Sequence, residues 1–95
     1  MPRKRSRLEI VLDILDALAG GPENPTRLAT RVNLPYDRLA AILRSLESKG
    51  IVRVEEASRS QRSRQVILTK KGWELLDTLR SLKRVLRDFD LEDIL

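Results

Sequence analysis

The sequence contains no cysteine and no histidine. Without cysteine there are no disulfide bonds or thiol nucleophiles, and without both residues most kinds of zinc site are excluded. A hydroxyl nucleophile would lack an imidazole base, and the chain has no glycine-rich phosphate-binding loop. We therefore expect a protein that is not an enzyme and that needs no metal or other cofactor.

Aromatic residues and long hydrophobic runs are also scarce. The aromatics are Tyr36, Trp73 and Phe89, so the core of this 95-residue chain must be mostly aliphatic, and the length is that of one domain. No apolar run is long enough for a transmembrane helix. Glu9 and Asp13 interrupt the segment that would have to be apolar in a secretory signal. We expect a soluble cytoplasmic protein.

Positive charge is concentrated in one part of the chain. Residues 1–71 contain fifteen Lys and Arg against eight Asp and Glu, whereas residues 72–95 contain four against six. A basic body with an acidic end favours a polyanionic partner. The alternative is that these charges serve stability, as in many proteins of thermophiles.

Three helices are expected in the first half of the chain. The first begins at Ser6, because Ser6 and Glu9 have the spacing of a capping box, and ends at Gly20-Gly21-Pro22. The second follows its N-cap Asn24 and Pro25, and the third extends from about Pro35 to Lys49. Between them Asn33-Leu34-Pro35 is expected to form a tight turn, because Asn33 tolerates the left-handed conformation. The second and third helices are short and are separated by a turn of about three or four residues, which is typical of a helix-turn-helix.

A hairpin and a last helix are expected in the second half. Segments 51–54 and 65–68 are β-branched and flank a polar loop, which predicts two strands joined by a long connection. A third strand near 22–25 would contain two prolines, so we expect at most one bridge there. Thr69 is the expected N-cap of the final helix.

This order of elements predicts a winged helix-turn-helix of the mainly α (α+β) class. It consists of three helices and a β-hairpin wing, followed by a C-terminal coiled-coil-like helix. We divide the chain into a basic disordered arm (1–5), a winged helix-turn-helix domain (6–71) and a C-terminal dimerisation helix (72–95).

The sequence also resembles the small archaeal winged-helix DNA-binding proteins of the chromatin-associated type. The segments that carry the resemblance are Arg5-Ser6-Arg7-Leu8-Glu9-Ile10, Asn33-Leu34-Pro35-Tyr36 and Leu68-Thr69-Lys70-Lys71-Gly72. Pro35 stands where that family usually has a serine, and the terminal helix is shorter than the family's coiled-coil arm. The resemblance implies double-stranded DNA as a partner and a homodimer formed through the last helix.

Several polar residues are candidates for DNA contacts on the third helix. At 100° per residue, the face opposite Leu39, Leu43 and Leu46 is polar or small, which suits a helix in a major groove. The alternative is an ordinary solvated helix face. Asp37 on this face could accept from a cytosine amine, but it is interpreted as complementing the helix N-terminus. The candidates on this helix are Tyr36, Arg38, Arg44, Ser45 and Ser48.

Other arginines and a lysine are expected to contact phosphates. Those of the wing lie in a loop rich in serine, where guanidinium groups suit phosphate oxygens or the minor groove. The alternatives are a solubilising loop and an unordered basic terminus. The candidates are Arg59, Arg62 and Arg64 in the wing, Arg3, Lys4 and Arg5 in the arm, and Arg27 and Arg31 on the second helix.

The last helix has apolar residues at alternating spacings of four and three, typical of a coiled-coil seam. Too little chain remains to cover them, so a second copy is the expected partner, although the seam could also pack on its own domain. Trp73 is expected in the core or in this interface. The interface candidates are Leu75, Leu79, Leu82, Leu86, Phe89 and Ile94.

These observations predict a homodimeric double-stranded DNA-binding protein, either a transcriptional regulator or a nucleoid-associated protein. The third helix would enter the major groove, and the wing would contact the backbone or the minor groove. The alternative function is a winged-helix module that binds protein or RNA within a transcription or replication assembly.

Overall fold

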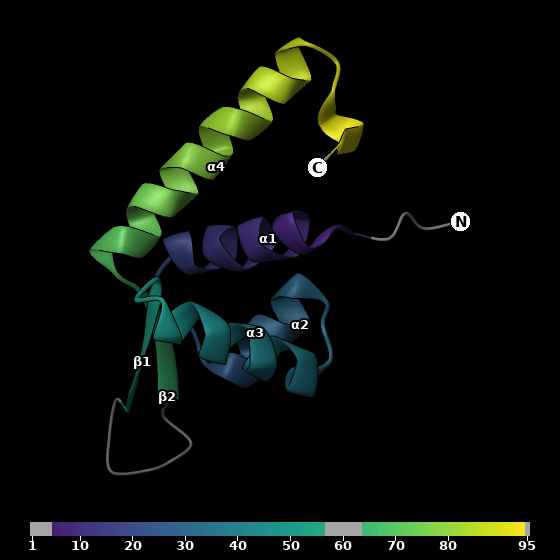
Figure 1. The fold of residues 1–95 in the computed structure, drawn as a ribbon. Helices are drawn as coiled ribbons and strands as arrows, with labels where there is room; N and C mark the ends of the chain where they lie inside the picture. Colours follow the sequence, from purple (N-terminus) through teal and green to yellow (C-terminus); the bar gives the residue numbers. More distant parts are fainter. Residues whose placement is uncertain (1–4, 57–63, 95) are drawn as a thin grey trace.

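The computed structural model describes residues 5–56 and 64–94. Four α-helices and a two-stranded antiparallel hairpin confirm the predicted winged helix-turn-helix (Figure 1). The elements in chain order are α1 (Arg7–Ala19), α2 (Pro25–Val32), α3 (Tyr36–Ser48), β1 (Val52–Glu56), β2 (Arg64–Leu68), α4 (Lys70–Asp88) and the short 3₁₀ helix η2 (Glu92–Ile94).

Helix α1 is the central element of the domain. Its predicted capping box is present: the Glu9 amide donates to the Ser6 hydroxyl at 3.1 Å, and the Ser6 amide donates to the Glu9 carboxylate at 3.3 Å. The helix ends at Gly20, which keeps right-handed backbone angles, and the positive φ of 131° falls on Gly21. Because α1 packs against α2, α4 and β2, apolar residues on more than one of its faces are buried.

The turn between α2 and α3 follows the predicted chemistry closely. The Asn24 side chain caps α2 by accepting from the Thr26 and Arg27 amides at 2.8 and 3.4 Å. Asn33 ends α2 in the left-handed conformation, with φ of 58°. Pro35 supplies no side-chain hydrogen bond to α3. Its ψ of 143° makes it the N-cap, so the first helical residue is Tyr36, one position later than expected.

The wing is held against the start of α2. Strands β1 and β2 pair with Val52 opposite Leu68 and Glu56 opposite Arg64. An isolated bridge joins Glu23 to Val66 through two backbone hydrogen bonds of 2.8 and 3.2 Å, which confirms the expected single bridge to a third segment. This bridge fixes the base of the wing relative to the helix-turn-helix.

A compact joint connects α3, β1 and α4. The Thr69 hydroxyl caps α4 by accepting from the Gly72 amide at 3.1 Å and lies within donor distance of the Gly50 and Ile51 carbonyl oxygens. Lys71 donates to the Lys49 carbonyl oxygen at 2.9 Å. A Cβ on Gly72 would clash with the Ile51 carbonyl oxygen.

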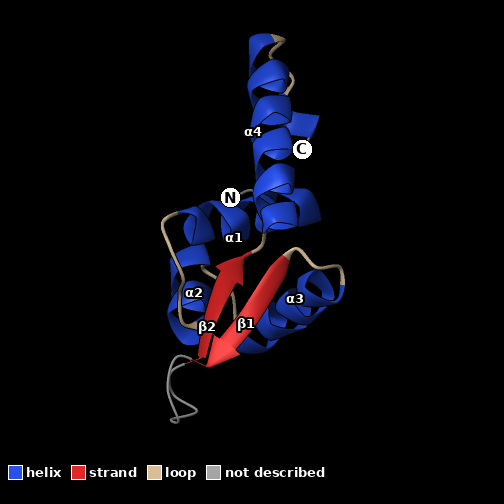
Figure 2. Ribbon diagram, turned by 90° about the vertical axis from the view of Figure 1, so that its left-hand side faces the viewer, coloured by secondary structure: helices blue, strands red, loops and turns tan. Residues whose placement is uncertain are grey.

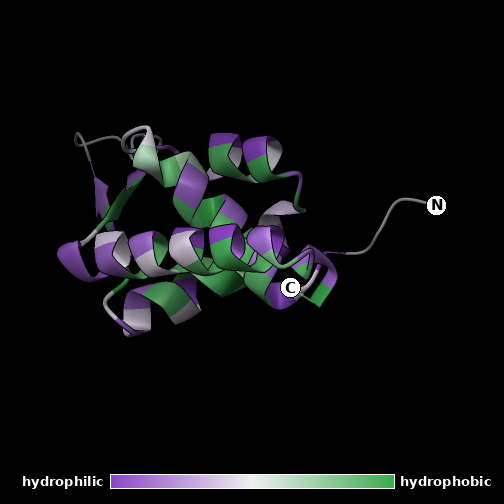
Figure 3. Ribbon diagram, turned by 90° about the horizontal axis from the view of Figure 1, so that it is seen from above, coloured by the Kyte–Doolittle hydropathy of each residue, from purple (hydrophilic) through white to green (hydrophobic). Residues whose placement is uncertain are grey.

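The core is aliphatic, as predicted, and hydrophobic residues gather between the helices (Figure 3). Tyr36, Trp73 and Phe89 are 48%, 45% and 71% exposed, so Trp73 does not lie in the core of this chain. The core residues are Ile10, Leu12, Ile14, Leu15, Leu18, Leu28, Ala29, Val32, Leu34, Leu39, Leu43, Leu46, Ile51, Val52, Val66, Leu68, Leu76 and Leu79.

Helix α4 projects from the domain on the side away from α3 and the wing, and two perpendicular views show this arrangement (Figures 1 and 2). Its first half packs on α1, where Arg80 forms an ion pair with Asp16 at 2.7 Å. At its C-terminus, the Leu91 amide donates a hydrogen bond to the Leu86 carbonyl oxygen, and the Asp90 amide donates one to the Arg87 carbonyl oxygen. Together with the positive φ of Asp90, these bonds form a Schellman motif.

Candidate nucleic-acid interface

A groove of about 370 Å³ lies between α3, the start of α2 and the wing strands. The groove is formed by residues that are distant in sequence, because the Glu23–Val66 bridge and the α3–β1 packing bring these elements together. Its lining residues are Pro25 of α2, Tyr36, Asp37, Ala40, Leu43, Arg44 and Glu47 of α3, Val54 of β1 and Arg64 of β2.

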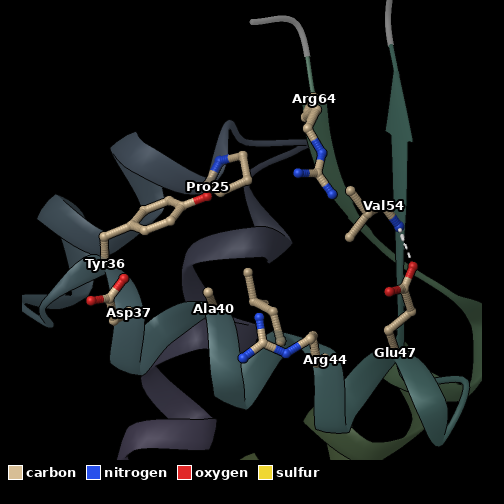
Figure 4. Close-up of a pocket in the computed structure, with 9 residues that line it drawn as sticks. Pro25, Tyr36, Asp37, Ala40, Arg44, Glu47, Val54 and Arg64 are labelled. Carbon is tan, nitrogen blue, oxygen red and sulfur yellow. Dashed lines mark hydrogen bonds between the residues drawn. The ribbon is translucent and has the colours of Figure 1, made fainter. Parts of the chain in front are cut away.

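Two of the candidate arginines line this groove from different elements. Arg64 extends from β2 into the space between Tyr36 and Val54, and Arg44 lies across the groove on α3 (Figure 4). Strand alternation explains the direction of Arg64, because it shares a face with the buried Val66. Within the ranges that the structure describes, no carboxylate forms an ion pair with Arg44 or Arg64, so both charges face an open groove.

The groove also contains two carboxylates. Glu47 accepts a hydrogen bond from the Val54 amide at 3.4 Å, which joins α3 to β1. Asp37 lies in the first turn of α3 and is exposed. Glu47, Ala40 and Val54 were not predicted to lie at the site. The spacing of residues 37, 40, 44 and 47 places them on one face of a helix, so it could have indicated the α3 part of the groove.

The remaining α3 candidates lie on the solvent face beside the groove. Arg38 is exposed, as is Ser48. The Ser48 hydroxyl donates to the Ser45 carbonyl oxygen at 2.8 Å, and Lys49 donates to the Ser45 hydroxyl at the same distance. Each serine hydroxyl therefore has an intramolecular bond, whereas Arg38 forms no ion pair with any described residue.

The arginines expected on α2 and in the arm differ in their partners. Arg31 forms an ion pair with Glu23 at 3.0 Å. Arg5 forms one with Asp13 at 2.8 Å and donates to the Asn33 carbonyl oxygen at 3.1 Å, so it belongs to the folded body.

Arg27 is exposed near the start of α2, and it has no ion pair within the described part of the chain. The other basic candidates, Arg3, Lys4, Arg59 and Arg62, lie outside the described residues.

The apolar residues of α4 divide into two groups. Leu79 is 9% exposed and Leu75 packs against the core of the same chain, so this part of the seam lies on its own domain. Leu86 is half-buried. The large apolar residues that are exposed in the distal part are Leu82, Val85, Phe89, Leu91 and Ile94.

Residues 5–56 and 64–94 contain neither a metal-binding cluster nor a membrane-spanning helix. No group of three or more acidic residues in the described ranges could hold a metal ion. No helix among the described residues is long and apolar enough to cross a membrane.

A family model described as winged helix-turn-helix matches residues 4–87. The chain belongs to this family. Among solved structures, the winged helix-turn-helix chain is similar to the transcriptional regulator BldR from Sulfolobus solfataricus, with 30% identity and a TM-score of 0.78 over 88% of this chain and 60% of that one. Among curated proteins, no sequence match was found.

Two further structures share the fold. The transcriptional repressor CouR, bound to a 23-mer DNA duplex, is 24% identical, with a TM-score of 0.78 over 97% of this chain and 64% of that one. Sso10a-2, a DNA-binding protein from Sulfolobus solfataricus, is 19% identical, with a TM-score of 0.75 over 90% of this chain and 85% of that one.

The resemblance to archaeal winged-helix proteins is thus confirmed. The chain spans less than two thirds of the length of BldR and of CouR.

Proposed function

We propose that this protein is a double-stranded DNA-binding transcriptional regulator. The observation that carries the proposal is that Arg44 of α3 and Arg64 of β2 line one groove without a carboxylate partner among the described residues. Both guanidinium groups can donate to phosphate oxygens or to guanine edges. The solved duplex complex of CouR supports the proposal by similarity of fold.

In this proposal, α3 enters the major groove and the wing follows the neighbouring backbone. The small residues Ala41 and Ser48 on the solvent face of α3 allow close approach to base edges. Arg38 and Arg27 extend the basic surface on either side, and Arg3, Lys4, Arg59 and Arg62 are proposed to add phosphate contacts. Arg5 and Arg31 contribute less, because each already has an acidic partner.

A salt titration of duplex binding tests this proposal. Because the contacts are mostly from Lys and Arg to phosphates, the logarithm of affinity should fall linearly and steeply with the logarithm of salt concentration. A random-sequence duplex and a duplex selected from a random pool are compared at each salt concentration. Absence of binding at about 50 mM salt would favour the protein-binding alternative.

We also propose that the protein is a homodimer formed through the distal part of α4 and the residues that follow it. Phe89 is 71% exposed and continues the exposed apolar row of Leu82 and Val85, and Ile94 of η2 is 65% exposed. Such a row is unfavourable in water, and a second copy would cover it. Two DNA-binding faces would then be related by a twofold axis.

The charges of this segment favour an antiparallel arrangement. Residues 80–87 contain four Lys and Arg and no acid, whereas residues 88–93 contain four Asp and Glu and no base. Antiparallel pairing places opposite charges next to each other, and parallel pairing in register places like charges together.

The absence of native cysteine allows a direct disulfide test of this arrangement. Chains carrying Arg84→Cys should cross-link to chains carrying Leu91→Cys. Two Arg84→Cys chains should not cross-link with each other. The opposite pattern would indicate a parallel pair.

A further inference from the structure

Asp37 is an unexpected residue for a surface that binds a polyanion. Its carboxylate lines the same groove as Arg44 and is exposed. Within the described ranges it forms no hydrogen bond or ion pair. A carboxylate near phosphates weakens binding by Coulomb repulsion, so its presence there needs a compensating contact or a purely structural role.

The position of Asp37 relative to Arg44 suits contact with bases. The two residues are seven positions apart on one helix, which places them on the same face and about 10 Å apart along the axis. This separation corresponds to about three base-pair steps of ~3.4 Å each. Ala40 and Ala41 lie between them and leave room for the helix backbone to approach the base edges.

We propose that Asp37 is a specificity-determining residue that accepts a hydrogen bond from the N4 amine of cytosine in the major groove. Arg44 would donate to O6 and N7 of a guanine about three base pairs away, since these are the favoured partners of carboxylate and guanidinium groups. The proposal rests on the DNA-binding function proposed above. It implies a site-selective regulator rather than a protein that packages DNA without regard to sequence.

Glu47 provides a matched control in the same groove. Its carboxylate accepts from the Val54 amide, so it already has a structural partner. Asp37→Asn and Glu47→Gln each remove one negative charge from the groove and keep the size of the side chain. Both variants should therefore bind random duplexes slightly more tightly than the natural protein, and only Asp37→Asn should change the preferred sequence.

The experiment selects duplexes from a random pool with the natural protein and with both variants, and then measures binding to the selected site and to the same site with the cytosine replaced. The natural protein and Glu47→Gln should prefer the cytosine by about 5- to 150-fold, whereas Asp37→Asn should prefer adenine at that position, because an amide side chain pairs bidentately with adenine N6 and N7. Thermal unfolding of each variant is measured in parallel. A residue that only complements the N-terminus of α3 would lower the melting temperature and leave the selected site unchanged.

The outcomes separate this inference from the function on which it rests. If the natural protein binds duplexes but Asp37→Asn selects the same site with the same preference, the inference is wrong and DNA binding stands. Selection of no sequence at all by the natural protein would also overturn the inference alone. If the natural protein binds no duplex, the proposed function fails and the inference fails with it.

Discussion

Replacement of Arg64 by glutamine tests a single arginine of the groove, and Arg53 provides the matched control. Both arginines are exposed and belong to the two paired strands of the wing. Arg64 shares a strand face with Val66 and lines the groove. Arg53 lies on the opposite face of the hairpin and forms an ion pair with Glu55 at 2.6 Å.

The expected effect follows from the number of phosphates contacted. On the proposed interface Arg64 neutralises one phosphate, which contributes about 0.9 to the slope of log affinity against log salt. At about 0.1 M salt, the loss of that contact lowers affinity by about eightfold, or ~1.2 kcal/mol. Arg53→Gln should change affinity by less than about twofold, because a surface arginine with an acidic neighbour outside the interface contributes little.

The assay is fluorescence anisotropy of a labelled duplex titrated with each variant over a range of salt concentrations. Arg64→Gln should reduce both the affinity and the salt slope for selected and random duplexes alike, since a phosphate contact carries no sequence information. Equal losses in the Arg64 and Arg53 variants would show that only total charge matters. An unchanged slope for Arg64→Gln would refute the placement of the wing base against the backbone.

Three further predictions concern stability and assembly. Gly72→Ala should lower the free energy of unfolding by about 1–3 kcal/mol in a denaturant titration, because the added Cβ would clash with the Ile51 carbonyl oxygen. Gly20→Ala is the control and should raise the free energy of unfolding by about 0.4–1 kcal/mol, because it restricts the unfolded chain. Asn33→Ala should cost about 1–2 kcal/mol because of the left-handed backbone at that position, and Asn33→Gly should be close to neutral; equal losses would contradict the argument. Phe89→Asp should convert the proposed dimer to a monomer in sedimentation equilibrium while the circular dichroism of the folded domain is retained, and a dimer that persists would exclude the distal end of α4 as the interface.

Local chemistry allowed much of the fold to be predicted. The capping box of Ser6 and Glu9, the Asn24 cap and the left-handed Asn33 each depend on residues a few positions apart, and the structure contains all three. Thr69 was likewise recognised as the N-cap of α4. Such signals act through backbone groups within one turn, so they are independent of the tertiary fold.

The groove depends on contacts that sequence spacing does not encode. Arg44 and Arg64 line the same groove only because the hairpin register directs Arg64 toward the helices and the Glu23–Val66 bridge fixes the wing base. Glu47 was missed for a similar reason, since its partner is a backbone amide on a strand. The sequence predicted that the third helix and the wing share one DNA-binding face, whereas the placement of Arg44 and Arg64 in one groove depends on these tertiary contacts.

The apolar seam of α4 shows another limit of periodicity. Spacings of four and three define one face of a helix but do not show whether that face packs on its own chain or on a partner. Leu79 is buried against its own domain, while Leu82 and Phe89 remain exposed. The division follows from the direction in which α4 leaves the domain (Figure 2).

The segment Leu68-Thr69-Lys70-Lys71-Gly72 is explained by packing. Thr69 caps α4, Lys71 donates to a carbonyl oxygen at the end of α3, and Gly72 permits close approach of the β1 backbone. Its role in this chain is therefore to hold the wing, α3 and α4 in fixed relation. Two lysines there do not by themselves indicate a nucleic-acid contact.

The central claim is that α3 and the base of the wing form one DNA-binding face. Titration of the isotopically labelled protein with a short duplex, followed by amide chemical-shift mapping, tests it most directly. The claim predicts that the largest shifts occur at residues 36–48, at Arg64 and at the start of α2, with little change at residues 82–94. Shifts confined to the distal part of α4, or spread without regard to the groove, would contradict it.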